Sequence, residues 1–196
     1  LHYPLRRQRQ MCIRDRTDII QKIENTDWQH ITEAMHQSGY AIIPQLLSNN
    51  QCDELISTYS KADLYRKTVV MARHRFGLGE YKYFNYPLPE MIQAIRTQIY
   101  PHLAPIANSW FKALNIDTHF PLEHKTFLQK CHSQGQQKAT VLILKYEEGG
   151  FNTLHQDLYG DYYFPIQIVL MLSEPDEDFT GGEFVLTQHV PRAQSK

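Results

Sequence analysis

Apolar residues in the first two-thirds of the chain recur every three or four positions, which is the spacing of residues on one face of a helix. The longest such pattern predicts a helix over residues 89–114. We expect it to bend at Pro101 or Pro105, because proline cannot donate a backbone hydrogen bond inside a helix. The apolar face of this helix consists of Met91, Ile92, Ile95, Ile99 and Leu103.

Three further helices are predicted from the residues at their ends. Asp27 can cap a helix over residues 28–37, and Gly39 can end it, since glycine readily adopts the left-handed conformation found after helices. Ser48 can cap the next helix in the same way. Another helix is expected over residues 121–133. Helices therefore occupy much of the chain before residue 138.

Strands are predicted mainly in the last third of the chain. Runs of aliphatic and β-branched residues predict strands over 140–146, 164–172 and 181–187. A strand is also predicted over 40–43, and an extended segment over 64–71. Helices first and strands afterwards favour an α+β fold in which the helices support a β-sheet core.

The composition limits the classes of function that fit the chain. Its 196 residues suffice for one domain with a substantial core, and its net charge of −1 provides no overall positive field to attract nucleic acid. No apolar run reaches the roughly 20 residues of a transmembrane helix, and the start lacks the apolar core of a signal peptide. The three cysteines lack the spacing of a zinc site or a disulfide framework. We therefore expect a cytoplasmic protein without membrane association.

The first residues are expected to be foreign to the protein. The run Met11-Cys-Ile-Arg-Asp-Arg16 matches the translation of a transposon end used in preparing sequencing libraries, so we assign residues 1–16 to adapter-derived sequence. A natural basic amino-terminal tail is the alternative. Residues 17–196 then form a single domain, with helical support over 17–137 and the first strands of the core over 138–196.

The strongest candidate for chemistry is the pair His155 and Asp157. The pair follows a glycine turn at Gly149 and Gly150, and on an extended strand two residues at this spacing point to the same side. An imidazole and a carboxylate aimed at one point can share a metal ion. Two histidines and one carboxylate form the ligand set of non-heme Fe(II) oxygenases. The pair therefore predicts two of the three protein ligands of such a site.

The order of these segments resembles the 2-oxoglutarate- and Fe(II)-dependent dioxygenases. The spacing from Tyr146 to His155 and Asp157 is similar to that of the AlkB-type alkylation-repair demethylases, whose tyrosine at the matching position helps to hold 2-oxoglutarate. The resemblance spans roughly residues 39–196 and extends to a bacterial oxygenase family linked to oxidative demethylation of damaged DNA. The blocks that carry it are Val70-Met-Ala-Arg-His74, Gly79-Glu-Tyr-Lys-Tyr-Phe84, Tyr86-Pro-Leu-Pro-Glu90, Leu172-Ser-Glu-Pro175 and Phe184-Val-Leu-Thr187.

The resemblance implies a double-stranded β-helix, or jelly roll, truncated at the carboxyl end so that only its first strands are present. It implies that His155 and Asp157 bind Fe(II) and that Tyr146 hydrogen-bonds 2-oxoglutarate. O2 and 2-oxoglutarate are then consumed in hydroxylating a C–H bond, with ascorbate as a candidate reductant. A hydroxylated N-methyl group is lost as formaldehyde, which is demethylation. The distal histidine and the arginine that pairs with 2-oxoglutarate are expected beyond Lys196, so we expect negligible turnover from the chain as it stands.

Alternatives remain open for the third ligand and for the activity. His189 is an alternative third ligand, although the family places that histidine several strands later. Prolyl hydroxylases share the His-x-Asp signature, so hydroxylation of a protein side chain competes with demethylation. A function from another class is a non-catalytic jelly-roll or cupin-like module that holds a metal or a small molecule.

Residues 65–86 combine positive charge with aromatic rings. This combination can hold phosphates and stack an extruded base, and it equally suits a flap over the barrel mouth with its charges in solvent. Damaged DNA or another nucleic acid is therefore the leading candidate substrate, and a protein or a small molecule is the alternative. The residues concerned are Arg66, Lys67, Arg73, His74, Arg75, Phe76, Tyr81, Lys82, Tyr83, Phe84 and Tyr86.

Overall fold

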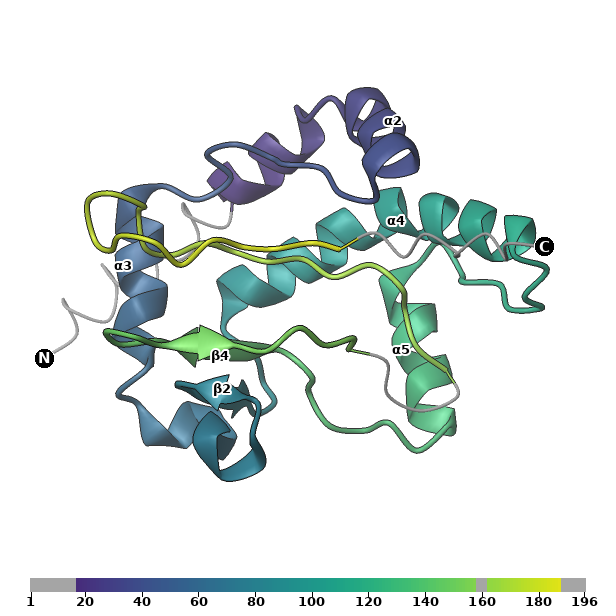
Figure 1. Ribbon diagram of the computed structural model, residues 1–196. Coiled ribbons are helices and arrows are strands. Elements are labelled where there is room, and N and C mark those ends of the chain that lie inside the picture. Colours follow the sequence, from purple (N-terminus) through teal and green to yellow (C-terminus); the bar gives the residue numbers. More distant parts are fainter. Residues whose placement is uncertain (1–16, 158–161, 188–196) are drawn as a thin grey trace, which may run out of the picture.

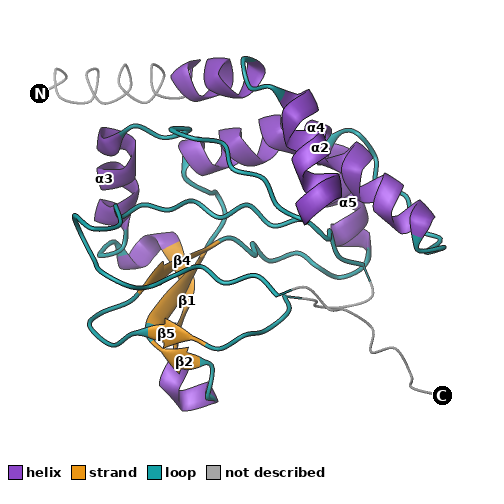
Figure 2. Cartoon of the chain, turned by 45° about the horizontal axis from the view of Figure 1, so that its top comes forward, coloured by secondary structure: helices purple, strands orange, loops and turns teal. Residues whose placement is uncertain are grey.

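The computed structural model describes residues 17–157 and 162–187 (Figure 1). Its architecture is α+β, as predicted, and its helices and strands gather in separate parts of the molecule (Figure 2). Residues 17–24 are helical. The elements that follow are α2 (Trp28–Ser38), α3 (Asn49–Thr58), η1 (Ala62–Leu64), β1 (Tyr65–Val70), η2 (Met71–His74), β2 (Gly77–Leu78), β3 (Glu80–Phe84), α4 (Glu90–Ala113), α5 (His124–Ser133), β4 (Leu142–Lys145) and β5 (Phe151–Asn152).

Helix α4 is the central element of the core and confirms the predicted long helix. Pro101 and Pro105 both lie within it at exposed positions. The five apolar positions predicted for its face are all buried, and they pack in one cluster with Met35 of α2, Phe84 of β3 and Ile143 of β4. Burial of this face against both the helices and the sheet holds the two parts of the molecule together.

The predicted end signals of the shorter helices are also confirmed. The Asp27 side chain accepts a hydrogen bond from the backbone N–H of His30, and Gly39 ends α2 with a left-handed φ of 78°. Ser48 and Gln51 form a reciprocal capping box at the start of α3. Helix α5 begins at His124, three residues later than the predicted start at 121. None of the described helices combines the length and the apolar character needed to cross a membrane.

The strands form two small antiparallel sheets. One has the order β1-β3-β4, and the other pairs β2 with β5 so that Gly77 lies opposite Asn152 and Leu78 opposite Phe151. Gly77 has a φ of 135°, and a Cβ atom there would overlap the carbonyl oxygen of Phe151. Glycine is therefore required for β5 to approach β2 this closely.

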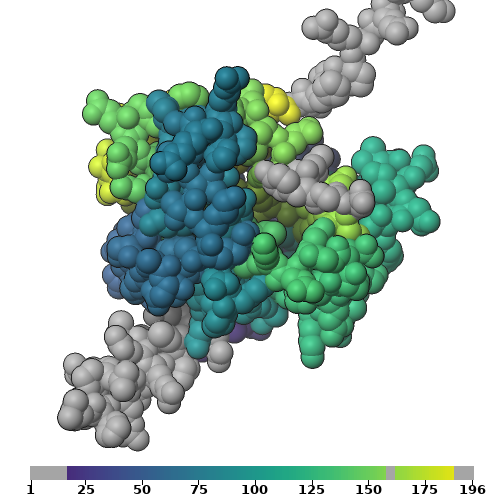
Figure 3. All heavy atoms as spheres, turned by 90° about the horizontal axis from the view of Figure 1, so that it is seen from below, coloured from purple at the N-terminus to yellow at the C-terminus, as the bar shows by residue number. Residues whose placement is uncertain are grey.

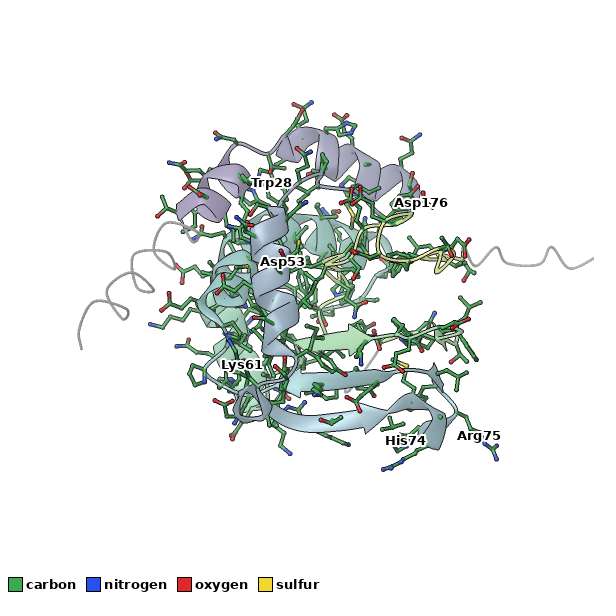
Figure 4. All side chains as sticks on the ribbon, turned by 90° about the vertical axis from the view of Figure 1, so that its left-hand side faces the viewer. Trp28, Asp53, Lys61, His74, Arg75 and Asp176 are labelled. Carbon is green, nitrogen blue, oxygen red and sulfur yellow. The ribbon has the colours of Figure 1, made fainter. Side chains whose placement is uncertain are left out.

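Three predicted strands are absent from the described chain. Residues 40–43, 164–172 and 181–187 have no strand assignment, so these predictions were wrong. The last two ranges lie on two passes that run side by side across the molecule (Figures 1 and 4). Phe164 and Ile166 still pack against the core. An apolar pattern records which side chains face the core, whereas a strand also needs a hydrogen-bonded neighbouring backbone.

The predicted jelly roll remains a prediction. The strands expected over 64–71 and 140–146 are present as β1 and β4. The two sheets that the described residues form have three and two strands, and they neither close into a jelly roll nor conflict with one.

A second cluster, rich in aromatic rings, lies between α4 and α5. His124 is buried within it at 6% exposure, with its Nδ1 atom 3.4 Å from the hydroxyl of Thr97 and its ring beside Tyr100. Burial lowers the pKa of His124 to about 4, and the positive charge of Arg96 acts in the same direction. The cluster itself, against which His124 lies, consists of Tyr100, Ala104, Ala107, Phe111, Phe120, Phe127 and Cys131.

The first prediction concerns Gly77. We expect Gly77→Ala to lower the free energy of unfolding by about 2–3 kcal/mol, because alanine is strained at this φ and its Cβ would overlap the β5 backbone. Gly135→Ala is the matched control, since Gly135 also has a positive φ of 82° but no atom within 4 Å of its Cβ position; we expect it to cost only about 1 kcal/mol. Chemical denaturation measures both. Equal losses would show that contact with β5 is unimportant.

The second prediction concerns pH. Because the pKa of His124 is lower in the folded chain than the ordinary 6.5, the unfolded chain binds the proton first. The stabilising effect of neutral His124 is thus complete above pH 6.5 and is lost as the pH falls toward 4. Between pH 7 and pH 4 we expect wild type to lose about 3 kcal/mol more than His124→Gln. Parallel curves of unfolding free energy against pH would contradict this.

Candidate metal site

The segment that carries His155 and Asp157 is attached to the β2 region just before the pair begins. The backbone N–H and the hydroxyl of Thr153 both donate to the carbonyl oxygen of Phe76, over 2.8 Å and 3.0 Å. Thr153 directly follows β5, so these two bonds extend the β2–β5 pairing by one residue. The position of His155 is therefore set from only two residues away.

A hydrogen bond sets which tautomer the neutral His155 ring adopts. Its Nδ1 atom lies 2.7 Å from the carbonyl oxygen of Thr153. A carbonyl oxygen can only accept, so Nδ1 carries the proton and Nε2 of the neutral ring has a lone pair. This Nε2 atom lies 3.5 Å from Oδ1 of Asp157. In this neutral tautomer a lone pair faces a carboxylate oxygen, an arrangement that a cation between the two atoms would stabilise.

The distance between these two atoms suits a shared metal ion. Nitrogen and oxygen ligands lie about 2.1 Å from a divalent metal of this size, so two ligands at a right angle are about 3 Å apart. At the tetrahedral angle they are about 3.4 Å apart. The side chains of His155 and Asp157 are 46% and 37% exposed, which leaves room for further ligands. The predicted pair therefore converges, although β5 ends at Asn152 and the pair is not on a strand.

Gln167 orients the carboxylate of Asp157, and the sequence did not single it out. Its side-chain amide donates to Oδ2 of Asp157 over 2.8 Å, so Oδ1 is the oxygen turned toward His155. Residues that hydrogen-bond a metal ligand from behind fix its orientation and raise metal affinity. One signal was available: Gln167 is the single polar residue in the run 164–172.

Tyr146 lies at the start of the turn between β4 and β5. Its ring packs against Gly79, where a Cβ atom would come within 2.9 Å of the ring, and its hydroxyl is hydrogen-bonded by the side chain of Asn152. Burial raises the pKa of Tyr146, and the bond with Asn152 offsets part of that effect. The hydroxyl is therefore neutral near pH 7 and available as a donor. A role in holding 2-oxoglutarate stays a prediction.

A third ligand is not found in the described part of the chain. Within residues 17–157 and 162–187, no group of three His, Cys, Asp or Glu side chains is placed to hold a metal ion. His189, the alternative third ligand, lies outside the described residues. Among the described residues, His155 and Asp157 are therefore a pair of candidate ligands without a third.

Two curated relatives are similar to this chain. They are the uncharacterized proteins MT2286 and Rv2227 from two strains of Mycobacterium tuberculosis, and each is 44% identical over 113 residues. The matched region is 58% of this chain and 48% of each relative, so the chain spans about half the length of the curated relatives it matches. No solved structure matches the chain.

A family of oxygenases matches the part of the chain that contains the site. Residues 79–196 match a family model described as an oxygenase catalysing oxidative methylation of damaged DNA. The matched region includes Tyr146, His155, Asp157 and Gln167. It covers more than half of the sequence, and the chain therefore belongs to this oxygenase family.

Proposed function

We propose that the chain carries part of the active site of a 2-oxoglutarate- and Fe(II)-dependent oxygenase that hydroxylates a C–H bond in damaged DNA. The observation that carries the proposal is the convergence of His155 Nε2 and Asp157 Oδ1 at 3.5 Å, with each side chain held from behind by a hydrogen bond. A neutral imidazole and a carboxylate are ligands that Fe(II) accepts. Membership of the oxygenase family supports the same chemistry.

Each described residue of the site has a defined task in this proposal. His155 offers Nε2 because Thr153 holds the proton on Nδ1, and Asp157 offers Oδ1 because Gln167 holds Oδ2. Tyr146 offers a neutral hydroxyl to a carboxylate oxygen of 2-oxoglutarate. We place the third protein ligand outside residues 17–157 and 162–187, since the described residues supply two.

The overall reaction balances without a further reactant. Bound Fe(II) would supply the activation of O2 that protein side chains cannot perform. One oxygen atom of O2 enters succinate as 2-oxoglutarate loses CO2, and the other enters the substrate C–H bond as a hydroxyl group. Where the substrate carbon is an N-methyl group, the product N–CH2OH breaks its C–N bond and releases formaldehyde, with the hydroxyl proton passing to nitrogen. Damaged DNA with N-methylated bases is therefore the substrate class that we propose.

The third prediction tests the ligand pair. We expect His155→Ala and Asp157→Ala each to lower the affinity for Fe(II), or for Co(II) as a spectroscopic substitute, by at least tenfold. Gln167→Leu is expected to lower it by about tenfold, because Asp157 is retained but loses its orienting bond. The matched controls are His132→Ala and Asp53→Ala, which remove exposed residues of the same types. Titration under anaerobic conditions measures all five; similar affinities throughout would disprove the site.

The fourth prediction tests the reaction. With Fe(II), 2-oxoglutarate and ascorbate, the M. tuberculosis relatives should form succinate and formaldehyde in equal amounts from oligonucleotides carrying N-methylated bases and no formaldehyde from unmethylated ones, whereas we expect negligible turnover from the chain itself. Because the chain spans about half of its relatives, the M. tuberculosis relatives are assayed beside it. Hydroxylation of prolyl peptides alone would replace the proposal with a protein hydroxylase. If the proteins bind metal but none of them forms succinate, the oxygenase proposal is wrong and a non-catalytic binding module replaces it.

A further inference from the structure

Apart from the exposed Lys67 on β1, the structure divides the positive charges of residues 65–86 into two groups, and the first group serves the fold. Arg66 lies over the Tyr83 ring at 4.3 Å and donates to the carbonyl oxygen of Ala139 over 3.0 Å. Lys82 lies 4.0 Å from the centre of the Tyr59 ring and donates to the Tyr59 carbonyl oxygen over 2.9 Å. These cations already have partners in the protein and are poor candidates for binding phosphate.

The second group lies at the turn between β1 and β2, and we call residues 73–76 the tip. Arg73, His74, Arg75 and Phe76 are all exposed. Within the described part of the chain, the guanidinium groups of Arg73 and Arg75 make no hydrogen bond and no ion pair. The rings of His74 and Phe76 stack on each other, with centroids 5.4 Å apart and planes at 23°. Figure 4 shows Arg75 extending from the ribbon into solvent.

The tip is joined directly to the segment that carries the ligand pair. The two bonds from Thr153 end on the carbonyl oxygen of Phe76, the last residue of the tip. His155 follows Thr153 by two residues, so its Cα lies within roughly 7 Å of the Thr153 Cα. A molecule lying on the tip would therefore reach the ligand pair.

Exposed apolar side chains continue this surface along the β2–β5 sheet. Leu78 and Phe151 face each other across the two strands and are 49% and 52% exposed, and Leu154 is 71% exposed. In Figure 3 the blue residues around 60–80 form a ridge, and green residues near 150 lie beside the end of this ridge. The surface around the tip thus combines free positive charge with flat and apolar groups.

Apart from Asp157 of the ligand pair, the acidic residues Glu147 and Glu148 lie at the other end of this small sheet. Because β2 and β5 are antiparallel, the turn that contains Glu147 and Glu148 lies toward Gly79, whereas the tip lies toward Thr153. Glu147 is also paired with Lys145 over 2.8 Å. Although the chain as a whole has a net charge of −1, the end of the sheet nearest the ligand pair therefore carries two arginines, Arg73 and Arg75, beside the single carboxylate of Asp157.

We propose that the tip binds a single-stranded stretch of nucleic acid and directs its target base toward His155 and Asp157. Arg73 and Arg75 contact phosphates, and a base neighbouring the target stacks on the paired rings of His74 and Phe76. Alternating cations and rings match the alternation of phosphate and base along one strand. Enzymes that modify a base must take it out of the stack, so an unpaired stretch is the form that fits. This inference rests on the proposed function and adds the place of substrate binding.

The fifth prediction measures binding, independently of turnover. The probe is a fluorescein-labelled, unmethylated single-stranded oligonucleotide of 12 nucleotides, followed by anisotropy at several salt concentrations. Arg73→Ala combined with Arg75→Ala should weaken binding at least tenfold and reduce the slope of log affinity against log salt by about 1.4, the value for two lost phosphate contacts. Phe76→Leu should weaken binding about tenfold and leave the slope unchanged, because stacking is lost and charge is not.

The control for charge is Lys125→Ala combined with Lys130→Ala, which removes two exposed cations of α5. We expect wild-type affinity and slope from this variant. Far-ultraviolet circular dichroism and hydrogen exchange at the Thr153 amide check that the tip variants keep the fold. Equal weakening by the tip and α5 variants would overturn the proposal, as would the absence of binding by wild type. So would an acidic peptide of equal charge that binds wild type as tightly as the oligonucleotide and is weakened equally by Phe76→Leu.

His155→Ala separates this inference from the proposed function. It should bind the oligonucleotide with wild-type affinity and salt dependence, because the tip is intact, while its metal affinity falls. If the tip variants bind nucleic acid normally but turnover of methylated oligonucleotides occurs, the tip proposal fails and the proposed function stands. If binding depends on the tip but no succinate is formed by the chain or its relatives, the proposed function fails and the binding site stands.

Discussion

The candidate site depends on one backbone carbonyl, that of Phe76. It accepts two hydrogen bonds from Thr153, and the carbonyl of Thr153 in turn accepts the proton of the His155 ring. The orientation of the imidazole is thus determined from the β2–β5 sheet through consecutive hydrogen bonds. This arrangement requires β2 and β5 to lie very close together, which only glycine at position 77 allows. Gly77 is therefore required for the orientation of the His155 ring, although the two residues are far apart in the sequence.

The elements that could be predicted from the sequence are those whose causes are local. Asp27, Gly39 and Ser48 act on backbone groups within four residues of themselves, and the helices that they delimit are present. The strand predicted over 164–172 failed because its cause is not local. Phe164 and Ile166 reach the core as the pattern indicates, yet the backbone beside them comes from another part of the chain, and its register is not encoded in the segment itself.

The candidate site could be predicted only in part from the sequence. The spacing of His155 and Asp157 identified the pair, but the reason given, a shared strand face, does not hold because β5 ends at Asn152. The two side chains meet because Thr153 and Gln167 hold them from behind. Gln167 could not be assigned to Asp157 from the sequence, since the contact depends on the path of the chain after the pair. Likewise, Arg66 and Lys82 differ from Arg73 and Arg75 only in having tertiary contacts for their charged groups. The sequence does not show these contacts.

The hydrogen bonds that orient His155 and Asp157 also affect the free energy with which a metal ion would bind to them. If the segment were flexible, binding of a metal ion would have to order both side chains and select one ring tautomer. The free energy needed for that ordering would lower the affinity for the metal. Here the hydrogen bonds with Thr153 and Gln167 orient both side chains when the chain folds. Metal binding therefore does not have to supply the free energy of ordering them. An imidazole and a carboxylate nevertheless accept Fe(II), Mn(II) and Zn(II) alike. In the proposed site the pair would set where a cation lies, and the ligands that complete its coordination would decide which cation is retained.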